Sequence, residues 1–217
     1  MSEPIISTNP ARCRDCYRCV RSCDVKAIRV KDHQAQIVQE LCILCGTCVR
    51  VCPQKAKSIR SDRRQVIEAI AAGRRVVASV APSAPAFFDM PDFQALAGAI
   101  RALGFEAVEE TAVGARMVGL AHGEYGARSL ERHPVIASAC PVVVNLVERY
   151  YPDLIPHLAP IVSPMIAHGR LLKRTYGEDA FIVFIGPCIA KKQEMEDEAV
   201  SGAVQAVLTF RGLKEWF

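Results

Sequence analysis

The chain has 217 residues, of which 51% are hydrophobic, and it carries a formal net charge of +4. A chain of this size can bury a core and has room for one medium-sized domain beside one small domain. No apolar run approaches the roughly 18 residues that a membrane-spanning helix needs, because Pro82, Pro85 and Pro141 interrupt the most apolar stretches. The composition therefore predicts a protein without a membrane span.

Eight of the ten cysteines lie in two runs with the same spacing. The runs are Cys13-x2-Cys16-x2-Cys19-x3-Cys23 and Cys42-x2-Cys45-x2-Cys48-x3-Cys52. Two intervening residues let a tight loop aim successive thiolates at one face of an iron-sulfur cube, and in two-cluster ferredoxins the last cysteine of each run ligates the other run's cluster. The pattern predicts two 4Fe-4S clusters, one held by Cys13, Cys16, Cys19 and Cys52 and the other by Cys42, Cys45, Cys48 and Cys23.

A disulfide framework and a pair of zinc sites are the alternatives for clustered cysteines. Residues 1–12 contain no apolar core of a secretory signal, so we expect a cytoplasmic protein in a reducing compartment, where disulfides do not persist. Zinc sites usually show two CxxC pairs with a longer spacer between them. One departure from the ferredoxin pattern is that Asp24 follows Cys23, whereas Pro53 follows Cys52.

The positive charge is concentrated in residues 1–64, which hold 13 Lys or Arg and 6 Asp or Glu. Taken alone, a basic segment of this kind can indicate nucleic-acid binding. Several of the arginines lie beside the cysteines, however, and eight cluster thiolates would add negative charge. We therefore expect counter-charge for the clusters or a docking face for an acidic redox partner, and no nucleic acid.

The first part of the chain is an internal repeat with a period of 29 residues, which maps Cys13 onto Cys42. It predicts a small, loop-rich α+β ferredoxin-like domain over residues 1–60, with the clusters as much of its core. Apolar residues then recur at helical spacing from Asp62 onward, Ser61 or Asp62 can cap a helix there, and Gly73 can end it. We expect this connecting helix over residues 61–74 to lead into a second domain.

Strands alternate with helices over residues 75–217, which predicts an α/β domain with a mainly parallel sheet. A buried strand is expected at residues 76–80, with a loop directly after it, and another at 135–138; further strands are expected at 105–108, where the pattern is weak, at 181–185 and at 204–209. Helices are expected from Asp92 to Gly104, from Pro141 to Tyr151, from Pro164 to Tyr176, near Ala190 and from Arg211. A further helix is expected with Val113, Met117 and Leu120 on one face. Ser163 is the expected cap of the helix that begins at Pro164. The last helix ends the chain without a further strand, so we expect a truncated domain that belongs to a longer protein.

The two remaining cysteines, Cys140 and Cys188, each follow an expected strand. Ligands of parallel sheets sit outside the carboxyl ends of the strands, so this placement suggests that the two thiols converge. The alternative is that they are buried and only pack, as free cysteines often do. The histidines show no metal-ligand spacing, and we expect surface or packing roles for His33, His133, His157 and His168.

Five segments of the chain resemble motifs of the iron-only (FeFe) hydrogenases. They are Val80-Ala81-Pro82-Ser83, Ser138-Ala139-Cys140-Pro141, Tyr150-Tyr151-Pro152, Ser163-Pro164, and Pro187-Cys188-Ile189-Ala190-Lys191-Lys192-Gln193-Glu194. The ferredoxin unit precedes them in the order that the family has. The resemblance covers nearly the whole chain and implies the first lobe of a hydrogenase-like domain.

In that family the catalytic cluster is a four-iron cube joined through a cysteine to a two-iron unit with carbonyl and cyanide ligands. The resemblance implies that Cys140 and Cys188 are two of the four cube ligands and that Lys191 bonds a cyanide, if the missing C-terminal motif is supplied. Without the resemblance, the charged residues Lys191, Lys192 and Glu194 would be interpreted as the solvent-exposed start of a helix. Lys191 and Glu194 are the only candidates for a catalytic role.

Three departures from the family pattern argue against fast hydrogen turnover. The third cysteine motif has no counterpart, and Ala139 stands where the hydrogen-evolving members have a proton-donating cysteine, although a methyl group cannot relay a proton. The acidic residues of the family's proton path fall on His122 and Tyr125, and its serine falls on Ala159. Gly186, where methionine is common, is expected to open the pocket wall. The pattern resembles the sensory branch of the family.

Three functions follow from these observations. The first is an iron-sulfur electron-transfer protein with a hydrogenase-like, redox-sensing role, which implies a redox protein partner and a downstream signalling domain. The second is part of an active hydrogenase, producing H2 from two protons and two electrons, completed by further sequence or by a partner subunit. The third is an iron-sulfur cluster assembly or scaffold protein. The sequence alone does not decide whether the protein is an enzyme.

Overall fold

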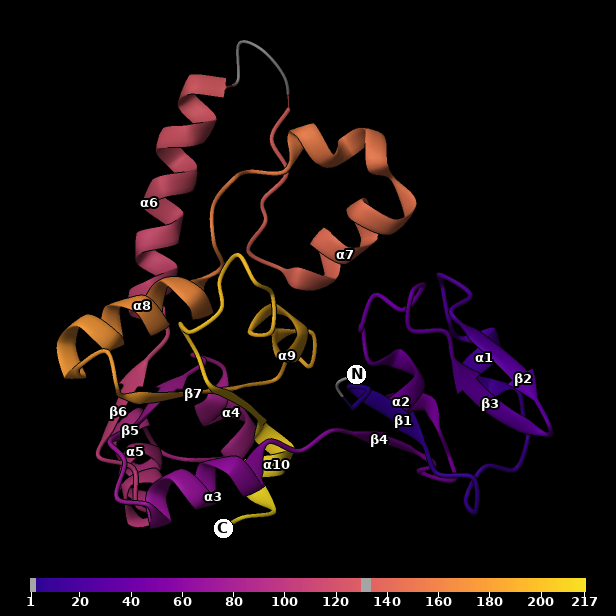
Figure 1. Ribbon diagram of the computed structural model, residues 1–217, viewed down its shortest axis with the longest axis horizontal. Coiled ribbons are helices and arrows are strands. Elements are labelled where there is room, and N and C mark those ends of the chain that lie inside the picture. Colours follow the sequence, from indigo (N-terminus) through magenta and orange to yellow (C-terminus); the bar gives the residue numbers. More distant parts are fainter. Residues whose placement is uncertain (1–2, 130–133) are drawn as a thin grey trace.

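A computed structural model describes residues 3–129 and 134–217 (Figure 1). The expectation for His133 lies outside these residues. The cysteine-rich part has two small antiparallel sheets: β1 (Ile6–Thr8) pairs with β4 (Lys57–Ile59), and β2 (Ile28–Lys31) pairs with β3 (Gln34–Ile37). Two short helices, α1 (Arg18–Arg21) and α2 (Thr47–Val51), begin inside the two cysteine runs. This arrangement confirms the expected ferredoxin-like unit.

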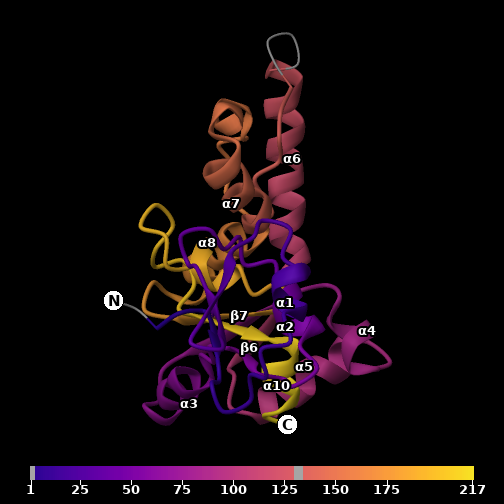
Figure 2. The ribbon, with the colours of Figure 1, turned by 90° about the vertical axis from the view of Figure 1, so that its right-hand side faces the viewer.

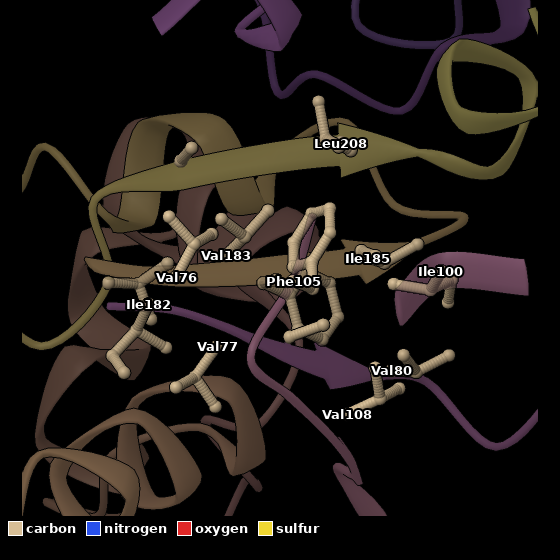
Figure 3. Packing of buried hydrophobic residues seen from close by; sticks show 14 of the residues in the cluster. Val76, Val77, Val80, Ile100, Phe105, Val108, Ile182, Val183, Ile185 and Leu208 are labelled. Carbon is tan, nitrogen blue, oxygen red and sulfur yellow. The ribbon is translucent and has the colours of Figure 1, made fainter. Parts of the chain in front are cut away.

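The second part is built on a four-stranded sheet with the order β6-β5-β7-β8. Its strands are β5 (Val76–Val80), β6 (Ala107–Glu110), β7 (Phe181–Gly186) and β8 (Ala206–Thr209), and all three pairings are parallel. Every residue of β5 and β7 is buried, as expected for central strands covered on both faces. Figure 3 shows their side chains packing with Phe105, Ile100 and Leu208. The predicted α/β domain with a parallel sheet is confirmed.

Helices pack around this sheet and above it. They are α3 (Arg63–Ala71), α4 (Ala84–Phe88), α5 (Phe93–Ala102), α6 (Ala112–Ser129), α7 (Pro141–Tyr150), the 3-10 helix η1 (Pro152–His157), α8 (Pro164–Tyr176), α9 (Lys191–Glu194) and α10 (Phe210–Lys214). Asp92 caps α5 as expected, because its Oδ1 accepts from the Ala95 amide at 2.9 Å. Figures 1 and 2 show α6 and α7 extending to the same side of the sheet.

A close approach holds α6 against α8. A Cβ atom on Gly114 would lie 2.5 Å from the Pro164 carbonyl oxygen and 2.7 Å from the His168 Cβ. Only a residue without a side chain fits at that separation, so Gly114 lets the long helix pack on α8 near its start. Residues 160–163 lead from Ala159 directly into α8.

Four local expectations are wrong. Residues 135–138 form only an isolated bridge, Ile136 to Leu158, and not a strand of the sheet. Strand β6 begins at Ala107 and not at residue 105. The expected loop after β5 contains α4. The apolar side of α6 is not buried: Val113, Met117 and Leu120 are 45%, 46% and 64% exposed. Helix α6 packs on α8 and extends away from the sheet (Figure 1).

Candidate metal centre

Four cysteines from both runs line one cavity in the ferredoxin-like part. They are Cys13, Cys16, Cys19 and Cys52. The fold brings Cys52 there because β4, which follows it, pairs with β1, which precedes the first run. The thiols surround this cavity and do not meet at one point: among residues 3–129 and 134–217, no three His, Cys, Asp or Glu side chains converge on a site for a single metal ion.

The other four cysteines of the two runs also lie near one another. Burial raises the pKa of the Cys42 thiol, and the nearby thiols of Cys45 and Cys23 raise it further. Burial raises the pKa of Cys48 to about 12. The nearby Lys57 ammonium lowers this pKa, and the thiols of Cys42 and Cys45 raise it. The Tyr150 hydroxyl lies 3.0 Å from the Val25 carbonyl and 2.7 Å from the Leu41 carbonyl, so the segment after Cys23 lies close to the start of the second run. Iron binding has to displace the protons of such thiols, since the ligand is the thiolate.

The same hydrogen bond recurs at both ends of the repeat. The Ala27 amide donates to Cys23 Sγ at 3.3 Å, and the Ala56 amide donates to Cys52 Sγ, also at 3.3 Å. Amide donors to cluster sulfurs tune the reduction potential. The bond at Cys23 is present although Asp24 replaces proline, so that departure leaves this feature of the turn unchanged. The donor set, the cavity and the amide bonds fit a pair of 4Fe-4S clusters.

Cys140 and Cys188 come together, although not for the expected reason. Cys188 follows β7, whereas Cys140 precedes α7 at the end of a segment outside the sheet. Burial raises the pKa of Cys188, the Lys191 ammonium lowers it, and the neighbouring Cys140 thiol raises it. Cys140 itself is exposed and Cys188 is half-buried. Because Cys140 is exposed, the alternative that it is a buried cysteine with only a packing role is wrong.

Lys191 joins the two segments that carry these cysteines. Its Nζ donates to the Ala139 carbonyl oxygen at 3.2 Å and lies 2.7 Å from Glu194 Oε2. Lys191 and Lys192 are 8% and 1% exposed, so the interpretation of a solvated helix start is wrong for both. Lys192 of helix α9 is buried because its Nζ lies 2.8 Å from Asp62 Oδ2 and donates to the Val207 carbonyl of β8. Asp62 consequently does not cap α3 with its side chain.

Helix α7 attaches the hydrogenase-like segment to the second cysteine run. Arg149 donates to the carbonyl oxygens of Gln39, at 2.8 Å, and of Cys42. The Tyr150 hydroxyl donates to the Leu41 carbonyl at 2.7 Å, and Asn145 Nδ2 to the Ile43 carbonyl at 3.5 Å. These bonds fix the second cysteine run beside the segment that begins at Cys140.

Apolar contacts reinforce this attachment. Ile189 packs in one buried cluster with Leu44, Cys19 and Cys48. A Cβ atom on Gly46 would lie 3.3 Å from Ile189 Cδ1, and the φ of 75° at Gly46 is the left-handed conformation that glycine adopts freely. The residue after Cys188 therefore packs on the loop that carries Cys45.

The residues that the resemblance set at the family's proton path are His122, Tyr125 and Ala159. His122 Nδ1 bonds the Val118 carbonyl at 2.9 Å, Tyr125 lies one turn further along α6, and Ala159 is buried. The Ser163 hydroxyl is buried without a partner and does not cap α8. Gly186 does not open the wall, because a Cβ there would lie 2.5 Å from the Phe184 ring.

Sequence reasoning missed a buried polar chain beside β5. His168 Nδ1 and the Ser79 hydroxyl are 2.8 Å apart, and Ser79 is 2.8 Å from the Thr111 hydroxyl. His168 Nε2 is buried without a hydrogen bond and lies 3.9 Å from Glu109 Oε2. The single serine in the otherwise apolar strand β5 was the available signal. His33, by contrast, is exposed and pairs with Asp15.

The fold and the cysteines define a two-cluster iron-sulfur protein with an α/β lobe. Residues 74–217 match the family model "Iron only hydrogenase large subunit, C-terminal domain", and residues 12–67 match a 4Fe-4S dicluster domain. The chain belongs to the iron-only hydrogenase large-subunit family. None of the helices in the described residues is both long and apolar enough to cross a membrane.

Similar proteins include hydrogenases and assembly factors. A cytosolic Fe-S cluster assembly factor NAR1 of Yarrowia lipolytica is 33% identical over 106 residues, which are 46% of this chain and 21% of that protein. The periplasmic Fe hydrogenase large subunit of Nitratidesulfovibrio vulgaris is 38% identical over 92 residues, 37% of this chain and 22% of that protein. The chain thus spans about a fifth of the curated relatives that it matches.

Solved FeFe-hydrogenase structures share the fold. One superposes with a TM-score of 0.65 at 24% identity over 73% of this chain and 47% of that chain. The apo hydrogenase HydA1 of Chlamydomonas reinhardtii, as a cysteine variant, gives a TM-score of 0.61 at 24% identity with the same coverage. The chain spans about half the length of these structures.

Proposed function

We propose that this protein transfers electrons between a redox partner and a hydrogenase-like site at Cys140 and Cys188, in a sensory or non-turnover role. Cys13, Cys16, Cys19 and Cys52 hold one 4Fe-4S cluster, and Cys42, Cys45, Cys48 and Cys23 hold the other. Each cluster, when bound, takes up and releases one electron. The observation that carries the proposal is the docking of α7 and Ile189 onto the loop of the second cysteine run.

The surface of the ferredoxin-like part supports entry of electrons from a partner protein. Cys16 and Cys45 are exposed, whereas Cys19 and Cys48 are buried. Basic side chains line the groove beside Cys45, namely Arg12, Arg50, Lys55, Arg60 and Arg211. A small acidic electron carrier has the complementary charge for such a groove, and such steering speeds association at low salt.

The hydrogenase-like site supports a slow or absent reaction with hydrogen. Ala139 offers only a methyl group where a proton would have to be transferred. Its carbonyl oxygen and Glu194 hold the Lys191 ammonium in place. Cys140, Cys188 and Lys191 would hold a third cluster only if further cysteine ligands are supplied, and a sensing role implies a signalling domain that receives the output.

Anaerobic purification and reconstitution test this function. We expect about eight irons and eight sulfides per chain, two one-electron signals in electron paramagnetic resonance after reduction, and little hydrogen from reduced dye after maturation. A colourless sample with zinc would contradict the electron-transfer proposal. Robust hydrogen production by this chain alone would contradict the non-turnover role.

A working hydrogenase completed by further sequence or by a partner subunit is the second candidate. The exposed apolar side of α6 favours it, since Val113, Met117 and Leu120 are suited to be covered by another segment. The full assembly should then show carbonyl and cyanide bands in the infrared. Absence of those bands from a matured, full-length preparation would remove this candidate.

Cluster assembly is the third candidate, and the similarity to NAR1 proteins favours it. An assembly protein would pass a labile cluster to an apo-acceptor. Mixing the reconstituted protein with an apo-ferredoxin under anaerobic conditions should then move iron and sulfide to the acceptor. Retention of both clusters would remove this candidate. All three functions fit the reducing cytoplasm.

A further inference from the structure

Lys57 is a buried lysine at the centre of the ferredoxin-like part. It is 6% exposed and opens β4, opposite Thr8 of β1. Its Nζ donates to the Ala35 carbonyl oxygen at 2.8 Å and to the Thr8 hydroxyl. The Thr8 hydroxyl in turn donates to the same carbonyl at 2.7 Å. The ammonium is therefore held in a fixed place by three strands.

No carboxylate in the described part of the chain neutralises this ammonium. None of the ion pairs among these residues includes Lys57, and both of its oxygen partners are neutral. Burying an ammonium without a counter-ion costs several kcal/mol. The two hydrogen bonds offset part of that cost, and a negative charge close by would offset the rest.

The internal repeat shows that packing does not require a lysine at this position. The 29-residue period that maps Cys23 onto Cys52 and Ala27 onto Ala56 maps Ile28 onto Lys57. Ile28 is 8% exposed and begins β2, as Lys57 begins β4. An apolar side chain therefore satisfies the equivalent place in the first half of the domain.

The surroundings of Lys57 indicate where the negative charge comes from. Lys57 lines the cavity formed by Cys13, Cys16, Cys19 and Cys52. Burial raises the pKa values of Cys19 and Cys48, and the Lys57 charge is the main influence that opposes burial at both. Lys57 thus faces the first cysteine cavity and also acts on the buried cysteine of the second run.

We propose that Lys57 is a built-in counter-charge for the cluster at Cys13, Cys16, Cys19 and Cys52, and that it raises the reduction potential of that cluster. The inference rests on the proposed electron-transfer function. Reduction adds one electron from a low-potential donor and makes or breaks no bond, so the net negative charge of the site grows by one. A fixed cation close by favours the more negative state. Electrons therefore enter this cluster more easily than they would with isoleucine at the position.

A potentiometric titration followed by electron paramagnetic resonance, with dithionite as the reductant, tests the inference. Lys57→Ile copies the residue of the first repeat, and Lys57→Gln keeps amide donors for Ala35 and Thr8 without the charge. In both variants, we expect the reduced-to-oxidised ratio at the wild-type midpoint to fall at least tenfold, which is about 59 mV for one electron. Lys31→Met is the matched control, since it removes an exposed charge at the end of β2 in the same domain and should change the ratio less than threefold.

The outcomes separate this inference from the proposed function. Neutral variants that load about eight irons and keep the wild-type midpoint would overturn the inference and leave electron transfer intact. Absence of iron from the wild-type chain would instead overturn the electron-transfer proposal. If neither neutral variant loads, Lys57→Arg decides: loading with a midpoint near the wild type supports the counter-charge, and failure of this variant as well overturns it.

Discussion

The Lys192 ammonium and the Asp62 carboxylate form an ion pair at 2.8 Å with side chains 1% and 3% exposed. Asp62 Oδ2 also accepts from the Val207 amide at 3.0 Å. The pair joins the start of the connecting helix to the segment after Cys188 and to the edge strand β8. It thereby fixes α9, which carries Lys191, relative to the ferredoxin-like part.

Breaking this pair should destabilise the protein strongly. Asp62→Asn leaves the Lys192 ammonium buried without a counter-ion, for which the loss of unfolding free energy is about 3 to 5 kcal/mol. Denaturant unfolding followed by tryptophan fluorescence measures it. Glu68→Gln is the control, because it breaks the exposed pair with Arg64 and should change stability little. A small effect of Asp62→Asn would show that the pair is not a structural tie.

The stability of the protein should fall in mild acid because of His168. Burial lowers the pKa of His168, and the nearby Glu109 carboxylate raises that pKa by a smaller amount. A depressed histidine pKa gives stability that is present above the ordinary value of 6.5 and lost as the pH falls below it. The ring faces Ser79 and Glu109, and these two residues are hydrogen-bonded in turn to Thr111 and Tyr176.

The His168→Asn variant tests that dependence. Its unfolding free energy should be lower than that of the wild type at pH 7.5 and should decrease less between pH 7.5 and 5.5. His33→Asn serves as the control, since His33 is exposed beside Asp15. Equal pH slopes for the wild type and His168→Asn would contradict the assignment to this residue.

Each run should supply the fourth ligand of the other run's cluster. Cys52→Ala should therefore give the same spectral change as Cys16→Ala, and Cys23→Ala the same change as Cys45→Ala, with a loss of up to about four irons in each case. Electron paramagnetic resonance spectra and iron analysis of the four variants show which cysteines hold the same cluster. A Cys52→Ala spectrum that matches Cys45→Ala would show that each run closes its own cluster.

Removing the α7 contacts should loosen the second cysteine run. Tyr150→Phe deletes the hydroxyl whose single proton is shared between the Leu41 and Val25 carbonyls, at about 0.5 to 1.5 kcal/mol in total. Amide hydrogen exchange in residues 39–44 should become faster. Tyr151→Phe is the matched control, because Tyr151 is 54% exposed. Unchanged exchange in Tyr150→Phe would place the attachment elsewhere.

Gly114 should not tolerate a side chain. Gly114→Ala forces a Cβ to within 2.5 Å of the Pro164 carbonyl oxygen, and overpacking of this kind costs about 1 to 3 kcal/mol. Gly119→Ala in the same helix meets no atom within 4 Å and should stabilise the helix by about 0.5 to 1 kcal/mol. Thermal unfolding of both variants separates the two cases, and equal effects would contradict the close packing of α6 on α8.

The sequence by itself determined the two cysteine runs, their repeat and the parallel α/β lobe. These features depend on local spacing, on apolar periodicity, or on motifs that resemble a known family. The strand expected before Cys140 was wrong because an apolar run of four residues does not reveal whether it finds a sheet to join.

Only the tertiary structure decided which charged groups are buried. The charge run after Cys188 favoured solvent exposure for Lys192, and nothing in the local sequence marked Lys57 or His168 as buried. Their burial depends on partners far away in the chain: Lys57 bonds the Ala35 carbonyl, Lys192 pairs with Asp62, and His168 bonds Ser79, which lies 89 positions earlier. Such contacts form when whole elements pack together, and no local pattern records them.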